Sequence, residues 1–510
     1  MSQLSWLVLS CYFVLMLAVG LWVRSRVKDA KDFFTAGGKM PWWLAGISHH
    51  MSGYSSAAFV GYAAIAYSDG ISLYLWWACS IAIALLIGSF VFPGQWVRLR
   101  LYTGMISPLE YLKARYSVGV QQVLAISGTL LKVFDVGAKW TASALLLNFY
   151  AGVPIFWGVL LTGGVTLVYS VVGGLWADAV TDLSQFLIQL VSGLLIFVAV
   201  VARLGGVHSL WTVWKQLPAS HHMPFHGKYT LTFMLVYTII NLLSYNGGTW
   251  SLAQRFLASP DEQSAIRSSR LSAALYVVWP LVLFFPMWVA PVLLPHLVDP
   301  SQSYARLSQE LLPHGLIGLV LAGLIAHSMA MTSSDANAIA AVVIRDIVPV
   351  FFPHSSAAQE QGQLFAARVF TFCFLLASMI VALLAPHMGG VLGLILLWYA
   401  ALVGPIAVPM LFGMLPALRR CGSRAALLSY VSGLIAFVAT KVFLSPQMQE
   451  SANGFVLAVG GPTLVSVFVF LISGLIAPQQ TPQSMELFRS IQHSSSSAMM
   501  KEAGISLSKG

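Results

Sequence analysis

Charged side chains are scarce in this chain of 510 residues. Aspartate, glutamate, lysine and arginine make up only 9% of it, whereas an average soluble domain contains about 25%. This scarcity excludes a large soluble domain, because 58% of the residues are hydrophobic. The P-loop motif Gly-x-x-x-x-Gly-Lys-[Ser/Thr] is also missing, which excludes ATP hydrolysis by that route.

Cysteines are few and far apart: Cys11, Cys79, Cys373 and Cys421. Their spacing excludes a disulfide framework and a zinc knuckle. The sequence shows neither a zinc motif, nor a Gly-x-Ser-x-Gly elbow, nor paired catalytic carboxylates. We therefore expect that the protein is not an enzyme and has no cofactor.

What the sequence does contain is long apolar runs. Thirteen of them are long enough to cross a hydrocarbon core of ~30 Å. They predict an all-α integral membrane protein with about 13 transmembrane helices, in contact with the lipid bilayer. The predicted spans are 4–23, 41–67, 72–94, 120–149, 152–172, 182–204, 229–256, 271–297, 313–344, 364–386, 389–417, 424–444 and 455–477.

The net charge of +10 is explained by topology. Basic residues gather in alternate short loops, of which 24–40 and 98–115 are the richest, and no basic stretch carries the interleaved aromatics of a nucleic-acid surface. We expect no nucleic-acid partner.

No positive charge precedes the run 4–23 and no small-residue cleavage site follows it, so it reads as a retained helix. The predicted location is the plasma (inner) membrane, with the N-terminus outside and the C-terminus in the cytoplasm.

Two spans contain polar interruptions rich in glycine. Residues 51–56 read Met-Ser-Gly-Tyr-Ser-Ser, and residues 245–250 read Tyr-Asn-Gly-Gly-Thr-Trp. A transporter helix that binds an ion often unwinds near the middle of the membrane and offers its freed carbonyl oxygens. Each interruption alone is also typical of small-residue packing between membrane helices.

Several segments resemble the sodium/solute symporter family, in family order over about 41–413. They are Pro41-Trp42-Trp43, 169–178 (Tyr-Ser-Val-Val-Gly-Gly-Leu-Trp-Ala-Asp) with 181–185, 254–258 (Gln-Arg-Phe-Leu-Ala), 312–319 and Gly404-Pro405-Ile406. The resemblance implies a LeuT-type fold with two inverted five-helix repeats.

On that basis the chain is divided into five parts. They are a leading helix and cytoplasmic loop (1–40), a first repeat (41–204), a second, inverted repeat (229–418), two trailing helices (419–477) and a disordered cytoplasmic tail (478–510).

The resemblance also implies a sodium ion between the first and eighth core helices, and Na⁺ is the only metal expected. Carbonyl oxygens would come from Met51 and Tyr54. In an ungapped comparison the family's hydroxyl pair falls on Ala330 and Met331, which carry no hydroxyl. The predicted oxygen sources are therefore Thr332, Ser333 and Ser334, although such hydroxyls also bond to their own helix.

Ionisable residues inside predicted spans are functional candidates, because burying charge in a membrane is costly. Offsets of three and four place Lys132, Asp135 and Lys139 on one helix face. One positive charge would be left over, and Lys139 would receive a solute carboxylate; a structural ion pair is the alternative. Asp135 and Asp335 are candidates for ion coupling.

Histidines near the proposed ion site, His50 and His327, are candidates for proton coupling, or are packing residues. Asp182 matches the aspartate that the family links to the inner ion exit; alternatively it complements a helix N-terminus. The predicted solute-binding residues are Ser52, Ser55, Lys139, Thr249, Trp250, Trp398 and Tyr399.

The leading hypothesis is sodium-coupled symport of a small organic solute by alternating access. A proton-coupled or uncoupled carrier of the same fold is the nearest alternative. A membrane sensor is a further alternative, which the short segment after 477 disfavours. The sequence names neither the solute nor the oligomeric state.

Overall fold

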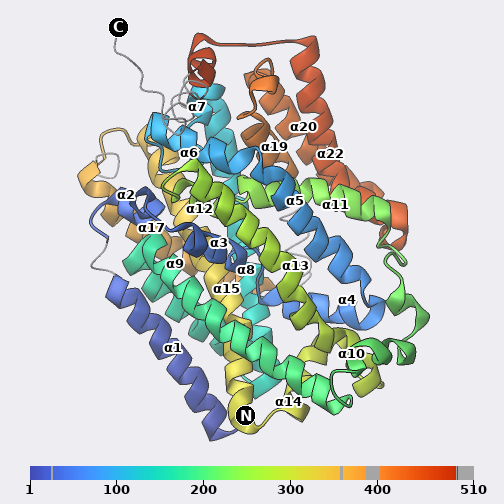
Figure 1. The fold of residues 1–510 in the computed structure, drawn as a ribbon. Helices are drawn as coiled ribbons and strands as arrows, with labels where there is room; N and C mark the ends of the chain where they lie inside the picture. Colours follow the sequence, from blue (N-terminus) through green and yellow to red (C-terminus); the bar gives the residue numbers. More distant parts are fainter. Residues whose placement is uncertain (24–26, 356–359, 386–402, 490, 492–510) are drawn as a thin grey trace, which may run out of the picture.

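The computed structural model describes residues 1–23, 27–355, 360–385, 403–489 and 491. In these ranges the chain forms helices joined by short loops, and the one β-type contact is an isolated bridge between His226 and Tyr229. Figure 1 shows the helices packed into one elongated bundle. The prediction of an all-helical protein is confirmed.

The following helices form the bundle. They are α1 (Gln3–Val23), α3 (Trp42–Met51), α4 (Gly61–Asp69), α5 (Ser80–Ser89), α6 (Phe92–Thr103), α8 (Val118–Ala151), α9 (Ile155–Arg203), α11 (Leu231–Leu243), α12 (Ser251–Leu257), α13 (Glu262–Leu293), α15 (His314–Val342), α17 (Glu360–Leu384), α19 (Gly404–Phe412), α20 (Ser423–Phe443) and α22 (Ala452–Ile476). The connecting segments contain the helices α2 (Ala30–Thr35), α7 (Leu112–Arg115), α10 (Ser209–Thr212), α14 (Ser303–Leu311), α16 (Val348–Phe351) and α21 (Pro446–Glu450).

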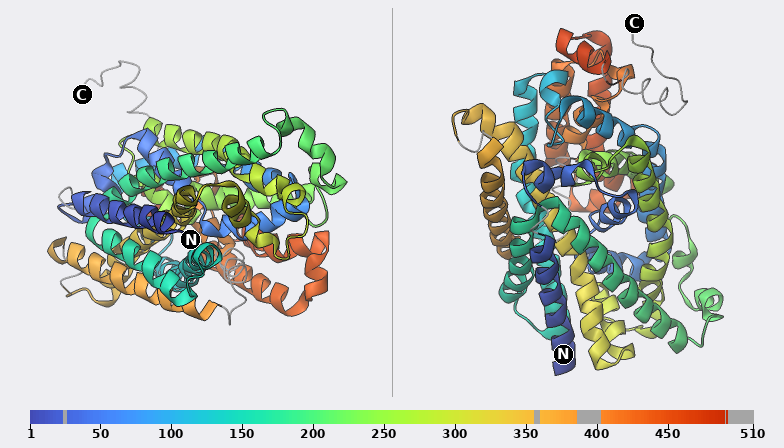
Figure 2. Two further views of the ribbon diagram at one scale, coloured as in Figure 1. Left: turned by 90° about the horizontal axis from the view of Figure 1, so that it is seen from below. Right: turned by 60° about the vertical axis from the view of Figure 1, so that its left-hand side comes forward.

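Seven helices in the described ranges are long and apolar enough to cross a membrane, and a pair bent by 49° (Tyr74–Ser89 with Phe92–Thr103) makes an eighth. The predicted spans 41–67 and 229–256 correspond to interrupted helices, and 120–149 corresponds to the single helix α8, which is not among the seven. The predicted span 389–417 begins outside the described residues. The right-hand view of Figure 2 shows long helices, α1 among them, running along the length of the bundle.

Helix α9 accounts for two predicted spans, 152–172 and 182–204. Its 49 residues would measure ~74 Å as one straight helix, more than twice a bilayer core. A break at Gly174 divides it, with φ +54° and ψ −149°. A side chain there would collide with the backbone of Phe33, so glycine satisfies both the dihedral angle and the close approach. The interval between the two predicted spans is helical apart from this break.

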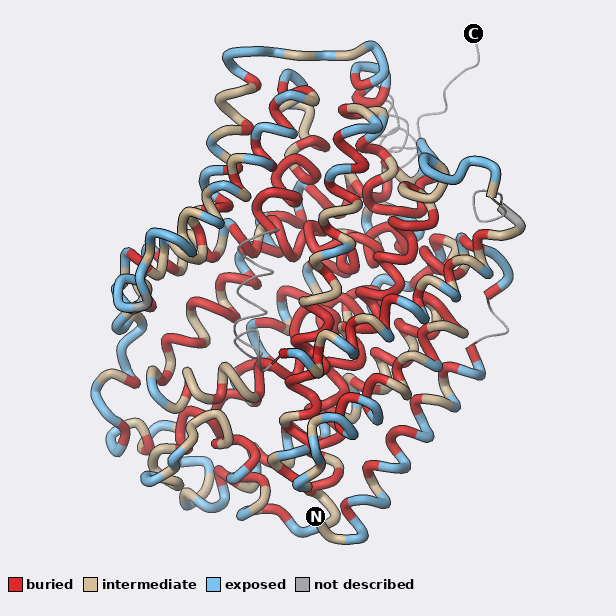
Figure 3. The backbone as a smooth tube through the Cα atoms, turned by 180° about the vertical axis from the view of Figure 1, so that it is seen from behind, coloured by how far each residue is buried: buried red, intermediate tan, exposed pale blue. Residues whose placement is uncertain are grey.

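Helix α15 forms the centre of the bundle. It packs against α1, α8, α9 and α17, and 78% of its most apolar window is buried, against 22% for α20. Figure 3 shows buried backbone concentrated in the middle of the molecule. Polar groups on α15 are therefore shielded from solvent and must find partners on neighbouring helices.

The expectation of a disordered tail is corrected for residues 478–489, because 482–489 form a helix. Leu487 and Phe488 are buried, and the Arg115 guanidinium lies 5.1 Å from the centre of the Phe488 ring. Buried apolar surface explains the order, although the segment is short and polar overall. The rest of the predicted tail lies outside the described residues.

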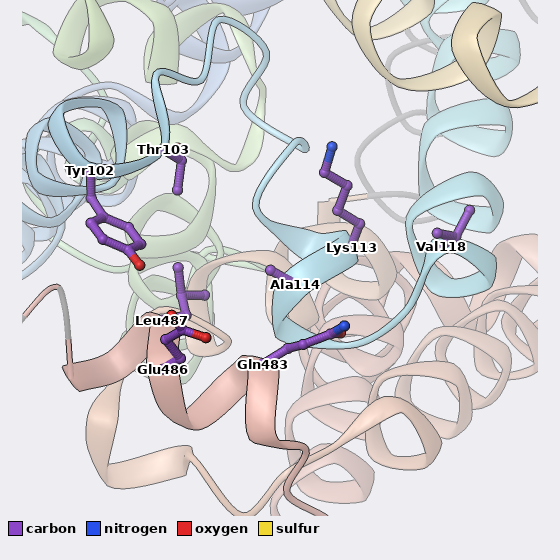
Figure 4. Close-up of a pocket in the computed structure, with 8 residues that line it drawn as sticks. All are labelled: Tyr102, Thr103, Lys113, Ala114, Val118, Gln483, Glu486 and Leu487. Atoms are coloured by element: carbon purple, nitrogen blue, oxygen red, sulfur yellow. The ribbon is translucent and has the colours of Figure 1, made fainter. Parts of the chain in front are cut away.

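Beside this terminal helix lies a surface groove of about 480 Å³ (Figure 4). It is lined by Tyr102, Thr103, Lys113, Ala114, Val118, Gln483, Glu486 and Leu487.

Candidate ion and solute site

Two interrupted helices meet inside the bundle. α3 ends at Met51, and helical geometry resumes at Ser56, where the 3₁₀ turn η3 (Ser56–Phe59) leads to α4. α11 ends at Leu243 and continues through the π-helical turn η7 (Ser244–Gly248) to α12. The Tyr245 hydroxyl of η7 donates a hydrogen bond of 2.6 Å to the carbonyl oxygen of Gly53. Both predicted interruptions are present, and they touch.

The first interruption is held against α15. The Ser56 N–H donates to the Ser328 hydroxyl at 3.0 Å, and the Ser56 hydroxyl donates to the carbonyl of Leu324 at 2.8 Å. The hydroxyls of Ser52 and Ser334 lie 2.8 Å apart. The Ser328 hydroxyl of α15 thus satisfies the Ser56 N–H at the end of the break, and the other two contacts hold side chains of the break against α15.

Of the three predicted hydroxyl ligands, two face another helix. Ser333 and Ser334 each donate to Asp178 of α9, the second at 2.8 Å. Thr332 donates to the carbonyl of Ser328 in its own helix at 2.6 Å. The hydroxyls of Ser333 and Ser334 also lie 3.0 and 2.8 Å from the Ala330 carbonyl, so the back-bonding arrangement that the sequence left open is present for all three. The sequence reasoning did not assign Asp178 to the site. It could have been noticed as the residue four positions before Asp182, on the same helix face.

Asp182 is also buried, and it accepts a hydrogen bond of 2.5 Å from the Ser48 hydroxyl of α3. It lies well inside α9, eight residues beyond the break at Gly174. The alternative that it complements a helix N-terminus is therefore wrong, because the dipole effect fades within the first turn.

The residue that connects these groups is Arg255 of α12, which is fully buried. Its guanidinium donates hydrogen bonds of 2.5 to 3.3 Å to side chains of α3, α9 and α15, namely Ser48, Ser52, Asp178, Asp182 and Ser334. In the sequence, Arg255 stands out only as part of a motif and as a basic residue near a loop. Its pairing with Asp178 cannot be seen in the sequence, because the two residues are 77 positions apart and meet only in the folded chain.

A second charged cluster joins α8 to α15. Lys132 and Lys139 both bind Asp135, at 3.1 and 2.8 Å, which confirms that the three share a helix face. Both lysines also bind Asp335 of α15, at 2.8 and 2.5 Å. The expected surplus positive charge was wrong, because Asp335 supplies a second carboxylate. The physical reason for assigning Lys139 to a solute carboxylate is thereby removed.

The profile of the sodium:solute symporter family matches residues 33–433 of this chain. The chain belongs to the sodium:solute symporter family. Among similar proteins are the human sodium/myo-inositol cotransporter 2 (26% identical over 471 residues, 84% of this chain and 68% of the relative) and the Vibrio parahaemolyticus sodium/glucose cotransporter (24% over 430 residues, 77% and 76%). The Aliivibrio fischeri sodium/sialic acid symporter NanT is 26% identical over 359 residues, covering 68% and 70%.

The fold of this symporter family member agrees with solved structures. A substrate-bound, outward-open Na⁺-coupled sialic acid symporter superposes with a TM-score of 0.82 at 22% identity, covering 94% of this chain and 99% of the other. A nucleobase-cation-symport-1 family transporter gives 0.54 at 14% identity, covering 91% and 99%. The expected LeuT-type fold is confirmed, and the chain is a multi-pass membrane transporter rather than an enzyme.

In this symporter both candidate histidines contact Tyr54, which lies in the first break. The ring centres of Tyr54 and His327 are 4.1 Å apart, and those of Tyr54 and His50 are 5.4 Å apart. Among the described residues, neither ring nitrogen of His327 has a hydrogen-bond partner. His327 therefore packs as an aromatic group in this conformation, whereas His50 Nε2 also lies 3.5 Å from the Tyr54 hydroxyl. A role of either histidine in proton coupling stays a prediction.

The predicted solute-binding residues of the symporter are scattered in their present contacts. The Ser55 hydroxyl caps η3 by accepting from the Ala57 N–H at 3.3 Å, and the Thr249 hydroxyl donates to the carbonyl of Ser244 at 3.2 Å. Trp250 has a positive φ of 60° and is buried. The predicted Trp398 and Tyr399 lie outside the described residues.

Proposed function

We propose that this chain couples inward sodium flow to the uptake of a small organic solute by alternating access. The observation that carries the proposal is the contact between Ser52, at the end of α3, and Ser334 of α15, beside the carboxylate of Asp178. Sodium is a hard cation that takes oxygen ligands, and this place offers hydroxyl and carboxylate oxygens together with an interrupted backbone.

The proposed sodium ligands are the carbonyls of Met51 and Tyr54 and the hydroxyls of Ser333 and Ser334. Thr332 remains a candidate that would have to leave its present bond to Ser328. Asp182, whose carboxylate lies beside the Arg255 guanidinium, is proposed to receive the ion on its way to the cytoplasm. A sodium ion that moves down a potential of 100 mV gains about 2.3 kcal/mol, enough for roughly fifty-fold accumulation.

The finer architecture is part of the proposal. We assign one leading helix, ten core helices in the inverted repeats 41–204 and 229–418, and two trailing helices, in the plasma membrane with the N-terminus outside. The first turn of α1 and the helix 482–489 lie at opposite ends of the bundle, as this topology requires (Figure 1). The short helix α7, which contains Lys113 and Arg115, lies at the same end as the helix 482–489, in keeping with a cytoplasmic face.

The solute is proposed to be uncharged and rich in hydroxyl groups. Relatives are named for myo-inositol, glucose and sialic acid, which are all rich in hydroxyl groups, and of these three sialic acid alone carries a carboxylate. Both lysines of the charged cluster are matched by carboxylates, so the described part of this cluster offers no spare cation to an acidic solute.

The test is uptake of radiolabelled myo-inositol, D-glucose and sialic acid into proteoliposomes, with an inward gradient of Na⁺ or of choline. We expect concentrative uptake of a neutral solute with Na⁺ only. Replacing both hydroxyls in the double variant Ser333→Ala/Ser334→Ala should weaken sodium activation at least tenfold, whereas Thr332→Val should change it less than threefold. Equal uptake in Na⁺ and choline would refute sodium coupling.

Proton coupling is the second candidate, favoured by the contacts of His50 and His327 with Tyr54 in the first break. It predicts that uptake in choline is driven by an inward proton gradient and that His327→Gln removes this dependence. The same liposomes, loaded at pH 7.5 and diluted into pH 5.5 without sodium, distinguish the two candidates.

A further inference from the structure

The cluster around Arg255 carries more negative charge than this arginine neutralises. Two buried carboxylates, Asp178 and Asp182, share the one guanidinium, at 2.5 and 3.3 Å. In the part of the chain that the structure describes, no other ion pair to either carboxylate is present. The outer oxygen Oδ1 of Asp182 is buried without a hydrogen-bond partner in the same part. With both carboxylates ionised, the cluster has one negative charge beyond that of Arg255, and Asp182 Oδ1 is an oxygen available to a second cation.

Arg255 also occupies oxygens that the proposed sodium site needs. Its Nη2 atom donates to the Ser334 hydroxyl at 2.5 Å and to Asp178 Oδ2 at 2.5 Å. The Ser334 hydroxyl in turn lies 2.8 Å from the same Asp178 oxygen. A sodium ion bound to these oxygens would lie within a few ångströms of the guanidinium, and two cations that close repel each other strongly in a buried site.

We propose that Arg255 is a resident counter-ion that competes with the coupling sodium ion for Asp178 and Ser334, and that it takes the ion's place when the carrier is empty. The inference rests on the proposed function, because it concerns the same sodium site. Arg255 is a positioning residue in this scheme: it does not contact the solute, and it sets how tightly sodium is held.

The physical need for such a residue arises in the return step. A symporter must reorient after both ligands have left, with its ion site vacated. An isolated carboxylate inside a membrane protein is costly unless it is paired. The guanidinium is paired with Asp178 and Asp182 while the site has no sodium, and its Nη1 and Nε atoms also donate to the Ser251 carbonyl and the Ser48 hydroxyl.

A purely structural clasp would have the same contacts but a different consequence. If Arg255 only held α12 against α9 and α15, its removal would disorder the oxygens and weaken sodium binding. If it competes, its removal frees the same oxygens and tightens sodium binding. The sign of the change in sodium affinity separates the two roles.

The experiment measures equilibrium binding of ²²Na⁺ to the purified full-length protein in detergent, without solute. We expect Arg255→Gln to lower the sodium dissociation constant at least tenfold, and Arg255→Lys, which keeps the charge, to change it less than threefold. The control is Arg115→Gln, since Arg115 is equally buried but donates to the backbone carbonyls of Gly413, Leu418 and Cys421. It should leave the constant unchanged.

Chemical rescue supplies a readout that a structural role would not move. In Arg255→Ala, guanidinium chloride at low millimolar concentration should compete with ²²Na⁺ and return the apparent affinity towards that of the unsubstituted protein. The unsubstituted protein should show no such competition in the same concentration range. Size-exclusion profiles and circular dichroism of each variant confirm that the fold is retained.

The possible results separate the inference from the function on which it rests. Saturable sodium binding that is unchanged or weaker in Arg255→Gln, or that guanidinium does not affect in Arg255→Ala, would overturn the role of Arg255 alone. Absence of saturable binding in every variant, up to 500 mM sodium, would overturn the proposed sodium coupling itself.

Discussion

The Tyr245 hydroxyl donates a 2.6 Å hydrogen bond to the Gly53 carbonyl and so ties the two interrupted helices to each other. Both residues are buried, and the carbonyl belongs to the stretch that has left the helix ladder. The two breaks were visible in the sequence as separate polar interruptions. Their contact couples the conformation of one interrupted helix to that of the other.

Tyr245→Phe tests this contact, because it removes the hydroxyl and little else. We expect a loss of stability of about 1–3 kcal/mol, since a buried carbonyl is left without this partner. Sodium activation of uptake should weaken as well, because the first break carries the proposed carbonyl ligands. The measurements are thermal unfolding in detergent and the sodium dependence of uptake.

The matched control for Tyr245→Phe is Tyr102→Phe, which removes an equivalent hydroxyl from an exposed position. It should leave both quantities unchanged. A Tyr245→Phe protein with the melting temperature and sodium dependence of the unsubstituted chain would contradict the coupling of the two breaks.

Asp335→Asn leaves the two buried lysines with one carboxylate between them. Breaking a buried ion pair by removing one partner typically costs about 3–5 kcal/mol, because a charge remains buried and unpaired. We expect low thermal stability and low expression. The comparison is Glu450→Gln, which breaks the pair with Lys228 at the surface, and such exposed pairs contribute about 0–1 kcal/mol.

The double variant Lys139→Met/Asp335→Leu separates the structural role of this cluster from a role in coupling. It removes one charge of each sign, so we expect it to be more stable than Asp335→Asn alone. Retained uptake in the double variant would show that neither charge is needed for transport. If it unfolds as readily as the single variant, unpaired charge is not the cause of the instability.

How much of this site was predictable depends on where each partner lies in the sequence. Lys132, Asp135 and Lys139 follow one another at helical spacing, so local periodicity placed them on one face. Asp335 is 203 positions from Lys132, and no local pattern pairs them. The predicted surplus charge was wrong for that reason.

The same distinction applies to the sodium site and to the fold. Apolar runs predicted the helices, and glycine-rich interruptions predicted their breaks, because each of these patterns lies within a short segment of the sequence. The guanidinium of Arg255 meets its carboxylates only through tertiary packing, and the helix 482–489 is ordered by burial of Phe488 against Arg115 rather than by its own composition.

Gly128 in α8 makes room for the indole of Trp250, the residue with a positive φ after the second break. A Cβ atom at Gly128 would collide with that ring. We therefore expect Gly128→Ala to displace Trp250 and to cost about 1–3 kcal/mol, as overpacking of a core does. Gly164→Ala is the matched helical control, because nothing lies within 4 Å of its added Cβ.

The control variant should be neutral or stabilising by about 0.5–1 kcal/mol, because alanine is the better helix former. Thermal unfolding of the two proteins in the same detergent, with uptake measured alongside, checks both expectations. Equal melting temperatures for Gly128→Ala and Gly164→Ala would show that the second break has space for Trp250 to move.

His221 holds the loop between α9 and α11 against the end of α4, and its ionisation is expected to make this loop depend on pH. Its Nε2 atom lies 2.9 Å from the carbonyl of Tyr67, and its own carbonyl accepts from the Ile71 N–H at 3.1 Å. Burial lowers the pKa of His221 below its usual value of about 6.5, because the charged imidazole is poorly solvated there.

The sign of the pH effect follows from this shift in pKa. At a pH between the pKa of His221 in the folded loop and its pKa in the unfolded loop, the unfolded loop binds more protons. The contribution of neutral His221 to the stability of the loop is therefore complete above about pH 6.5. It is lost as the pH falls through the pKa of the folded loop. We expect amide hydrogen exchange in 213–230 of the purified protein, corrected for the intrinsic rate, to become faster from pH 7.5 to pH 5.5. The variant His221→Asn should lose most of this dependence, because it cannot titrate there. A protection profile of the unsubstituted protein that is flat over this range would show that the loop is not held by the neutral imidazole.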